Sequence, residues 1–306
     1  MIYWMRPRPA PWRKALKAAL MCAGGAALML DVRPAVTQTL LDVYRERVAM
    51  GAIGARCRLF DADISAAQEA WTVQARTAAL RAGYTPQALD ASGDAARNYV
   101  DALNCASPRV QDAAVRTRDA FRAYSGLRRM NFPGQVASWR ADRSMPLQSA
   151  SWRLAQDAFA GEDKVVFGVA GQQGSESVAV SVAPSDGASP YAARLIVRDP
   201  TRLAEPLVRP GPFVLQARAP LRAAAKVILA EAKAPADPAL RPLGTGKAVA
   251  FRFPAAAKDA LAQLDPREAV SVEILYPSDR GDLVRTAFLE VGDYDAGMAF
   301  LKVAMR

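Results

Sequence analysis

The chain has 306 residues, of which 51% are hydrophobic and 23% are charged, and its formal net charge is +10. A chain of this length and composition buries one large core or two smaller ones, which excludes a disordered or collagen-like protein. It contains no histidine, so it cannot by itself build a Ser-His-Asp triad, a Cys-His dyad or a histidine-liganded metal site. We find no intact catalytic, cofactor or metal motif and expect none of these sites.

The first 37 residues have the pattern of a secretory signal peptide. Five basic residues between Arg6 and Lys17 precede an apolar run from Ala18 to Leu30, which is too short to cross a bilayer comfortably. Cleavage is expected after Ala35-Val36-Thr37, and the alternative is an uncleaved inner-membrane tether through residues 15–30. Either outcome predicts export, and the expected location is the periplasm of a Gram-negative bacterium.

Two cysteines, Cys57 and Cys105, remain after such a cleavage. An even number of cysteines in an exported protein predicts a disulfide bond. Cys57 falls just after the first predicted helix and Cys105 between the last two, so the bond would link loops of a helical domain.

Residues 38–127 are predicted to form that helical domain. Apolar residues recur at helical spacing, first at Leu41, Tyr44 and Val48 and then from Ile64 to Ala78. Further helix starts are indicated at Thr85-Pro86, at Ser92 and at Ser107-Pro108, because serine and threonine cap helices and proline is tolerated in the first turn.

A β-rich domain is predicted after a change of period. Residues 128–147 break the helical pattern and are expected to be a linker strap rich in arginine and aromatic residues. Residues 148–306 alternate with period two and are separated by turn residues, which predicts a mainly antiparallel β-sandwich-like domain with two short helices, after Pro254 and after Asp293 or Asp295. The expected fold class is α+β. The expected strands contain Val165–Val169, Val178–Val182, Ala193–Val197, Phe213–Ala217, Val227–Leu229, Val249–Phe253, Val270–Tyr276 and Leu283–Val291.

Paired carboxylates are the catalytic groups that a histidine-free chain could still use, as in glycoside hydrolysis. The candidates are Glu290, Asp293 and Asp295, and the pair Asp61 and Asp63. A strand end followed by a helix N-cap explains the first group more simply, because negative charge is favoured at a helix N-terminus.

The most informative functional pattern is a concentration of arginine. The segment from Arg109 to Arg153 contains nine arginines and three aspartates. Guanidinium groups interleaved with aromatic rings suit anionic or planar partners, although such arginines also pair with acids of their own chain. The predicted binding patch consists of Arg122, Arg128, Arg129, Phe132, Trp139, Arg140, Arg143 and Trp152.

These observations favour an exported cell-envelope protein that acts by binding, as an accessory or scaffold component of an envelope assembly, and not as an enzyme. The expected partner is an envelope protein or an anionic envelope glycan or lipid. Nucleic acid is not expected because the chain is expected to be exported. The alternatives are an envelope glycan- or lipid-binding protein and a carboxylate-dependent glycan hydrolase.

Overall fold

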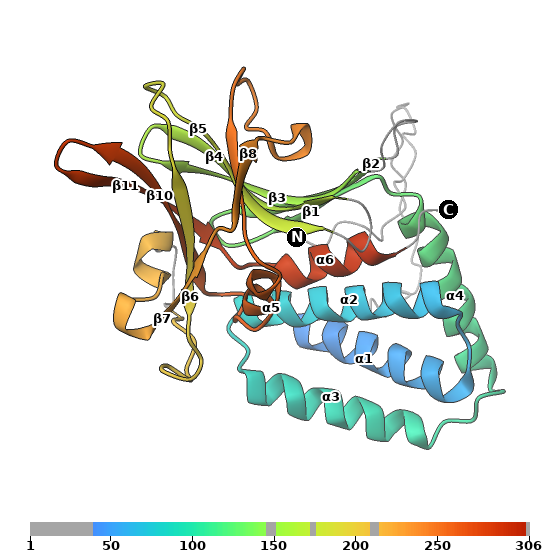
Figure 1. Ribbon diagram of the computed structural model, residues 1–306. Helices are drawn as coiled ribbons and strands as arrows, with labels where there is room; N and C mark the ends of the chain where they lie inside the picture. The colour runs from blue at the N-terminus through green and yellow to red at the C-terminus, as the bar shows by residue number, and fades with distance from the viewer. Residues whose placement is uncertain (1–38, 145–150, 172–175, 209–213, 304–306) are drawn as a thin grey trace, which may run out of the picture. The chain divides into compact units, whose positions relative to one another are not determined.

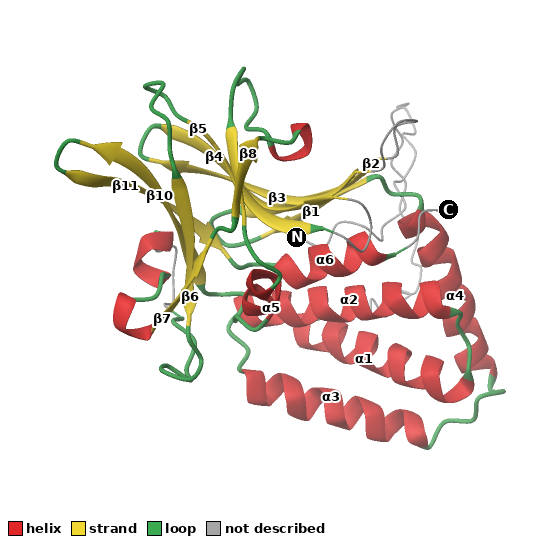
Figure 2. Ribbon diagram, viewed as in Figure 1, coloured by secondary structure: helices red, strands yellow, loops and turns green. Residues whose placement is uncertain are grey.

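A computed structural model describes residues 39–144, 151–171, 176–208 and 214–303. The predicted signal segment lies outside these residues. Residues Gln38–Arg306 form one compact unit that contains both the helices and the sheets (Figures 1 and 2). No helix in the described ranges is long and apolar enough to cross a membrane. The fold is α+β, as expected, with a helical region followed by a β-rich region.

Four helices form the N-terminal region: α1 (Leu40–Cys57), α2 (Ala62–Arg81), α3 (Pro86–Asp101) and α4 (Pro108–Ser125). Side chains of Thr39, Asp61 and Thr85 accept hydrogen bonds from the first turns of α1, α2 and α3, which satisfies backbone donors that have no partner within the helix. The helix start expected at Ser92 is wrong. Ser92 lies inside α3, which runs unbroken from the proline start at Pro86.

The predicted disulfide is confirmed. Cys57 and Cys105 are bonded, with their Cα atoms 5.6 Å apart, within the usual range for disulfides. The bond joins the end of α1 to the connection between α3 and α4.

The β-rich region consists of two antiparallel sheets. The seven-stranded sheet has the order β1-β2-β3-β4-β5-β9-β8, and the four-stranded sheet has the order β11-β10-β6-β7. The strands are β1 (Arg129–Pro133), β2 (Ser138–Ser144), β3 (Ser151–Ala160), β4 (Asp163–Gly171), β5 (Ser177–Ala183), β6 (Ala192–Arg198), β7 (Ala225–Leu229), β8 (Ala232–Pro235), β9 (Val249–Arg252), β10 (Ala269–Ser278) and β11 (Gly281–Glu290).

Three expectations for this region need correction. The segment 128–147, expected to be a linker, supplies β1 and β2 of the larger sheet. Strands β3 and β8 were not expected. The described part of the strand expected at Phe213–Ala217 is a short 3-10 helix, Leu215–Arg218, and Phe213 itself lies outside the described residues.

The two predicted short helices are present as α5 (Ala256–Ala262) and α6 (Tyr294–Lys302). Helix α6 contacts α2 on one side and strands β1, β2 and β3 on the other (Figure 1). The main hydrophobic core contains residues of both sheets, of α5 and α6, and also Ile64 from α2 and Phe121 from α4. Parts of α2 and α4 therefore join the core of the β-rich region, while the helices also form two smaller clusters of their own.

Candidate functional site

The structure divides the predicted binding patch into buried and exposed residues. Phe132, Trp139 and Trp152 belong to the main hydrophobic core, and the side chain of Arg143 is fully buried. These four side chains are packed inside the protein. The other four residues of the patch face solvent wholly or in part: Arg122, Arg128, Arg129 and Arg140.

Arg143 holds the ends of two helices. Its guanidinium donates hydrogen bonds to the carbonyl oxygens of Leu127 at 2.6 Å and Val303 at 2.7 Å, which lie just beyond the C-terminal ends of α4 and α6. It also lies over the ring of Phe300, 3.9 Å from the ring centre. A cation is stabilised at a helix C-terminus by the carbonyl groups there, so Arg143 fixes α4 and α6 to β2.

A second arginine group surrounds Asp142 on β2. Arg129 and Arg153 each donate a hydrogen bond to its carboxylate, and Arg140 lies 3.7 Å away while also pairing with Asp157. Burial alone would raise the pKa of Asp142, but the bonds from Arg129 and Arg153 hold it below its ordinary value. Most of the charge of these arginines is therefore satisfied within the chain.

The outer side of α4 carries the largest group of arginines that remains exposed. We define the basic surface of α4 as six exposed arginines together with two exposed aspartates, Asp112 and Asp119. The net charge of this surface is +4. Arg109, Arg116, Arg118 and Arg122 lie on α4, Arg128 follows the helix, and Arg129, which pairs with Asp142, begins β1. The opposite side of α4 is buried through Val110, Ala114 and Phe121, and this periodicity leaves the arginines outside.

The arginines of this surface differ in their internal contacts. Arg118 donates to the carbonyl oxygen of Leu59 at 2.7 Å, and Arg122 pairs with Asp119. Within the described residues, the guanidinium groups of Arg109, Arg116 and Arg128 have no hydrogen-bond or ion-pair partner. These three guanidinium groups can therefore donate all of their hydrogen bonds to another molecule.

Both ends of α4 are fixed. The disulfide lies just before its first turn and Arg143 binds the carbonyl groups at its last turn. An immobile helix loses little conformational entropy when it binds a partner. The sequence signal for this surface is a group of arginines, Arg109, Arg116, Arg118 and Arg122, at positions outside the buried side of an amphipathic helix. The aromatic residues predicted to belong to the binding patch lie in the main hydrophobic core instead.

The candidate catalytic carboxylate Glu290 is engaged inside the protein. It accepts hydrogen bonds from the backbone N–H groups of Gln135 at 2.7 Å and of Val136 and Ala137 at 2.8 Å. These donors belong to the turn between β1 and β2, and a Cβ atom at Gly134 would lie 2.5 Å from the same carboxylate. Glu290 therefore holds a tight turn against β11.

The other candidate carboxylates also have structural roles. Asp293 is almost fully buried and forms a bidentate ion pair with Arg81 at the end of α2. Burial raises the pKa of Asp293, although Arg81 opposes this shift. Asp61 caps α2, Asp63 lies in its first turn, and Asp295 is exposed in the first turn of α6. The acids are thus divided among separate helix starts.

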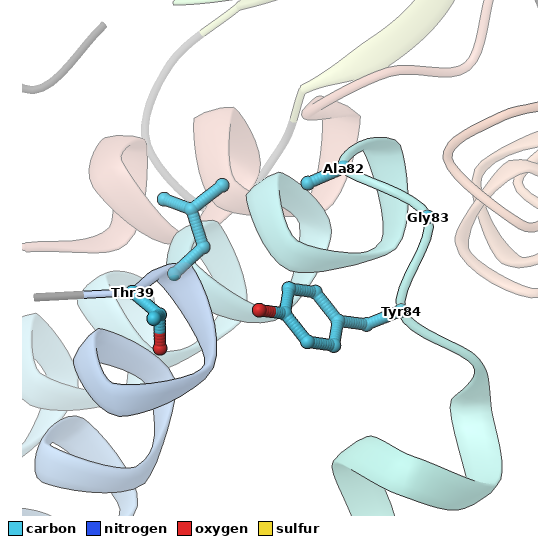
Figure 3. Close-up of a pocket in the computed structure, with 5 residues that line it drawn as sticks. Thr39, Ala82, Gly83 and Tyr84 are labelled. Atoms are coloured by element: carbon cyan, nitrogen blue, oxygen red, sulfur yellow. The ribbon is translucent and has the colours of Figure 1, made fainter.

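A shallow pocket lies between the start of α1 and the turn after α2, lined by Thr39, Leu40, Ala82, Gly83 and Tyr84 (Figure 3). The hydroxyl of Thr39 is already used in the capping box with Asp42. The lining contains no charged side chain, so the pocket offers no arrangement of groups for catalysis.

No protein-family model, curated protein or solved structure matches this chain significantly.

Proposed function

We propose that this protein is an exported cell-envelope protein that acts by binding an acidic protein partner, as an accessory or scaffold component of an envelope assembly. The observation that carries the proposal is the basic surface of α4. It presents six exposed arginines against two aspartates, on a helix that is fixed at both ends and on the residues that follow it.

Export is supported by the bonded pair Cys57 and Cys105. Disulfides persist in oxidising compartments such as the bacterial periplasm and are rare in the cytosol. The signal-like pattern of residues 1–37 supports the same location.

Binding through α4 is supported by the charge distribution. A surface of one sign speeds encounter with an oppositely charged surface and disfavours basic partners. Arg109, Arg116 and Arg128 supply planar donors that carboxylates accept in pairs.

The same donors suit an anionic glycan or lipid headgroup, which is the second candidate. We rank the glycan hydrolase below both candidates. Its best acids, Glu290 and Asp293, are buried and already engaged with backbone donors or with Arg81.

The test compares two double charge reversals in the tagged full chain after crosslinking in cells, with partners identified by mass spectrometry. Arg116→Glu with Arg128→Glu alters the basic surface. Lys247→Glu with Arg280→Glu makes the same change in charge at exposed positions on other elements. We expect the first variant to lose the partners of the native chain and the second to keep them, with unchanged melting temperatures.

Retention of the same partners by both variants contradicts the role of α4. A native chain that crosslinks to no protein contradicts the protein-partner proposal and favours the glycan or lipid candidate.

A further inference from the structure

Helix α4 is anchored differently in its two halves. In the second half the side chains of Phe121 and Tyr124 are part of the main hydrophobic core. In the first half the buried apolar side chains are Val110 and Ala114, and Val110 belongs to a small cluster with one buried residue each of α1 and α3. Aromatic side chains bury more apolar area than valine and alanine, so packing holds the second half more firmly.

The first turn of α4 also lacks features that stabilise the start of a helix. Thr39, Asp61 and Thr85 cap the other three N-terminal helices, but the side chain of Ser107 accepts no hydrogen bond from the start of α4. The first turn contains no acidic residue, and Arg109 places a positive charge there. A cation is unfavourable at a helix N-terminus, where the dipole is positive. The first turn of α4 therefore needs support from outside the helix.

The end of α1 gives that support. Arg56 donates hydrogen bonds to the carbonyl oxygens of Asp101 at 2.9 Å and of Leu103, at the end of α3 and just after it. Cys57 is bonded to Cys105, which is nearer to the start of α4. The disulfide is therefore the last of these contacts with α1 before α4 begins, and it is the one that a reductant removes.

Both cysteines are partly exposed, so a reductant can approach the bond. The class of reductant required is a dithiol. One of its thiolates attacks a sulfur of the bond and forms a mixed disulfide, which releases the other cysteine as a thiolate. The second thiol of the reductant then displaces the first cysteine. Two electrons and two protons pass to Cys57 and Cys105, which become thiols, and the dithiol leaves as a disulfide.

We propose that the bond between Cys57 and Cys105 is a redox switch for the basic surface of α4. While the bond is formed, Arg109 and Arg116 are presented on an ordered helix, together with Arg128 beyond its end. Reduction unfolds the first half of α4 and leaves the second half in place against the main core. This inference rests on the proposed function, because it concerns the regulation of binding at the same surface. Binding by the reduced chain must order the helix again, which costs conformational entropy.

Hydrogen exchange of backbone amides tests the conformational step without a partner. The full chain is compared before and after treatment with the dithiol dithiothreitol. We expect the ratio of the exchange rate of residues 109–116 to that of residues 119–125 to rise about tenfold or more on reduction. The ratio cancels a change in global stability, which affects both halves alike. An unchanged ratio contradicts the switch.

The variant Cys57→Ser with Cys105→Ser is the control for the reductant. It should show the raised ratio without dithiothreitol, and dithiothreitol should not change that ratio further. A variant whose ratio equals that of the untreated native chain overturns the proposal, because the bond would then not order the first half of α4.

Crosslinking in cells separates this inference from the proposed function. We expect the variant without the disulfide to crosslink the partners of the native chain about threefold less or weaker still, and Arg116→Glu with Arg128→Glu to lose them. If the charge reversal loses the partners and the variant without the disulfide keeps them in full, the switch is wrong and the proposed function stands. If both variants keep them in full, the basic surface does not bind the partners and both proposals are wrong.

Discussion

At the residue scale, Arg143 is the clearest case of a polar side chain that determines packing. It is fully buried, yet its donors reach carbonyl oxygens at the ends of both α4 and α6. From the sequence, its neighbours Trp139 and Trp152 suggested a surface patch of arginine and aromatic rings. The structure places the rings in the core and uses the arginine to bind helix ends.

We expect Arg143→Met to lower the free energy of unfolding by about 2–4 kcal/mol, because it leaves buried carbonyl groups without a donor. Urea denaturation followed by circular dichroism measures this change. Arg128→Met is the matched control. It removes an exposed guanidinium with no partner in the described residues, and it should change stability by less than about 0.5 kcal/mol. Equal effects of the two variants would contradict the structural role of Arg143.

Asp163 is a single residue that makes the stability of the folded protein depend on pH. Its buried carboxylate accepts bonds from the hydroxyl of Tyr276 at 2.6 Å and from Arg285 at 2.8 Å. Burial alone would raise the pKa of Asp163, but these bonds hold it below its ordinary value of 3.8. Between the two pKa values the unfolded chain binds more protons than the native protein, so this stabilisation is complete above about pH 5 and is lost as the pH falls through the native pKa.

We therefore expect Asp163→Asn to reduce the loss of stability between about pH 6 and pH 3. Urea midpoints at the two pH values give the comparison, with Asp112→Asn at an exposed position of α4 as the control. If Asp163→Asn loses as much stability on acidification as the native chain, the network around Asp163 does not carry this pH dependence.

At the element scale, the helices and strands predicted correctly from the sequence are those whose apolar pattern is not interrupted. Helices α1, α2 and α4 and strands β4, β5, β6, β10 and β11 were recognised in this way. Strands β2 and β3 were missed because Arg143 and Gln156 occupy inward positions that normally hold apolar residues. Strand β7 was also predicted. Val227 and Leu229 are exposed at an edge, and periodicity alone gives no sheet order.

The candidate site was predicted only in part, for a related reason. The concentration of arginine was visible in the sequence, but ion pairing depends on which strands are neighbours. The register that places Arg129 and Arg153 beside Asp142 joins segments with no local sequence signal. The arginines on α4 itself face outward because of helical spacing alone, so a sequence pattern can predict their exposure.

The disulfide gives a prediction for the helical region. Its cysteines are separated by 48 residues, and closing a loop of that length stabilises the folded state by about 4 kcal/mol in the chain-entropy model. We expect Cys57→Ser with Cys105→Ser to lower the free energy of unfolding by an amount of this order, measured by urea denaturation. The native chain after complete reduction should match the variant, and a negligible loss in both would contradict the stabilising role of the bond.

At the scale of the whole molecule, the helical region is joined to the sheets by α6 and by the ion pair of Arg81 with Asp293. Buried polar contacts therefore lie on the inner side of the helical region, whereas the outer side of α4 has arginines with unused donors. This division between structural and exposed arginines is the basis of the proposed function.

The most direct test of that function is a photo-crosslinking amino acid placed at position 116 of the full chain in living cells. The same group at position 280, on the turn between β10 and β11, is the control. We predict a defined set of envelope proteins crosslinked from position 116 and absent from position 280. The same products from both positions, or none from position 116, would contradict binding of a protein partner by the basic surface of α4.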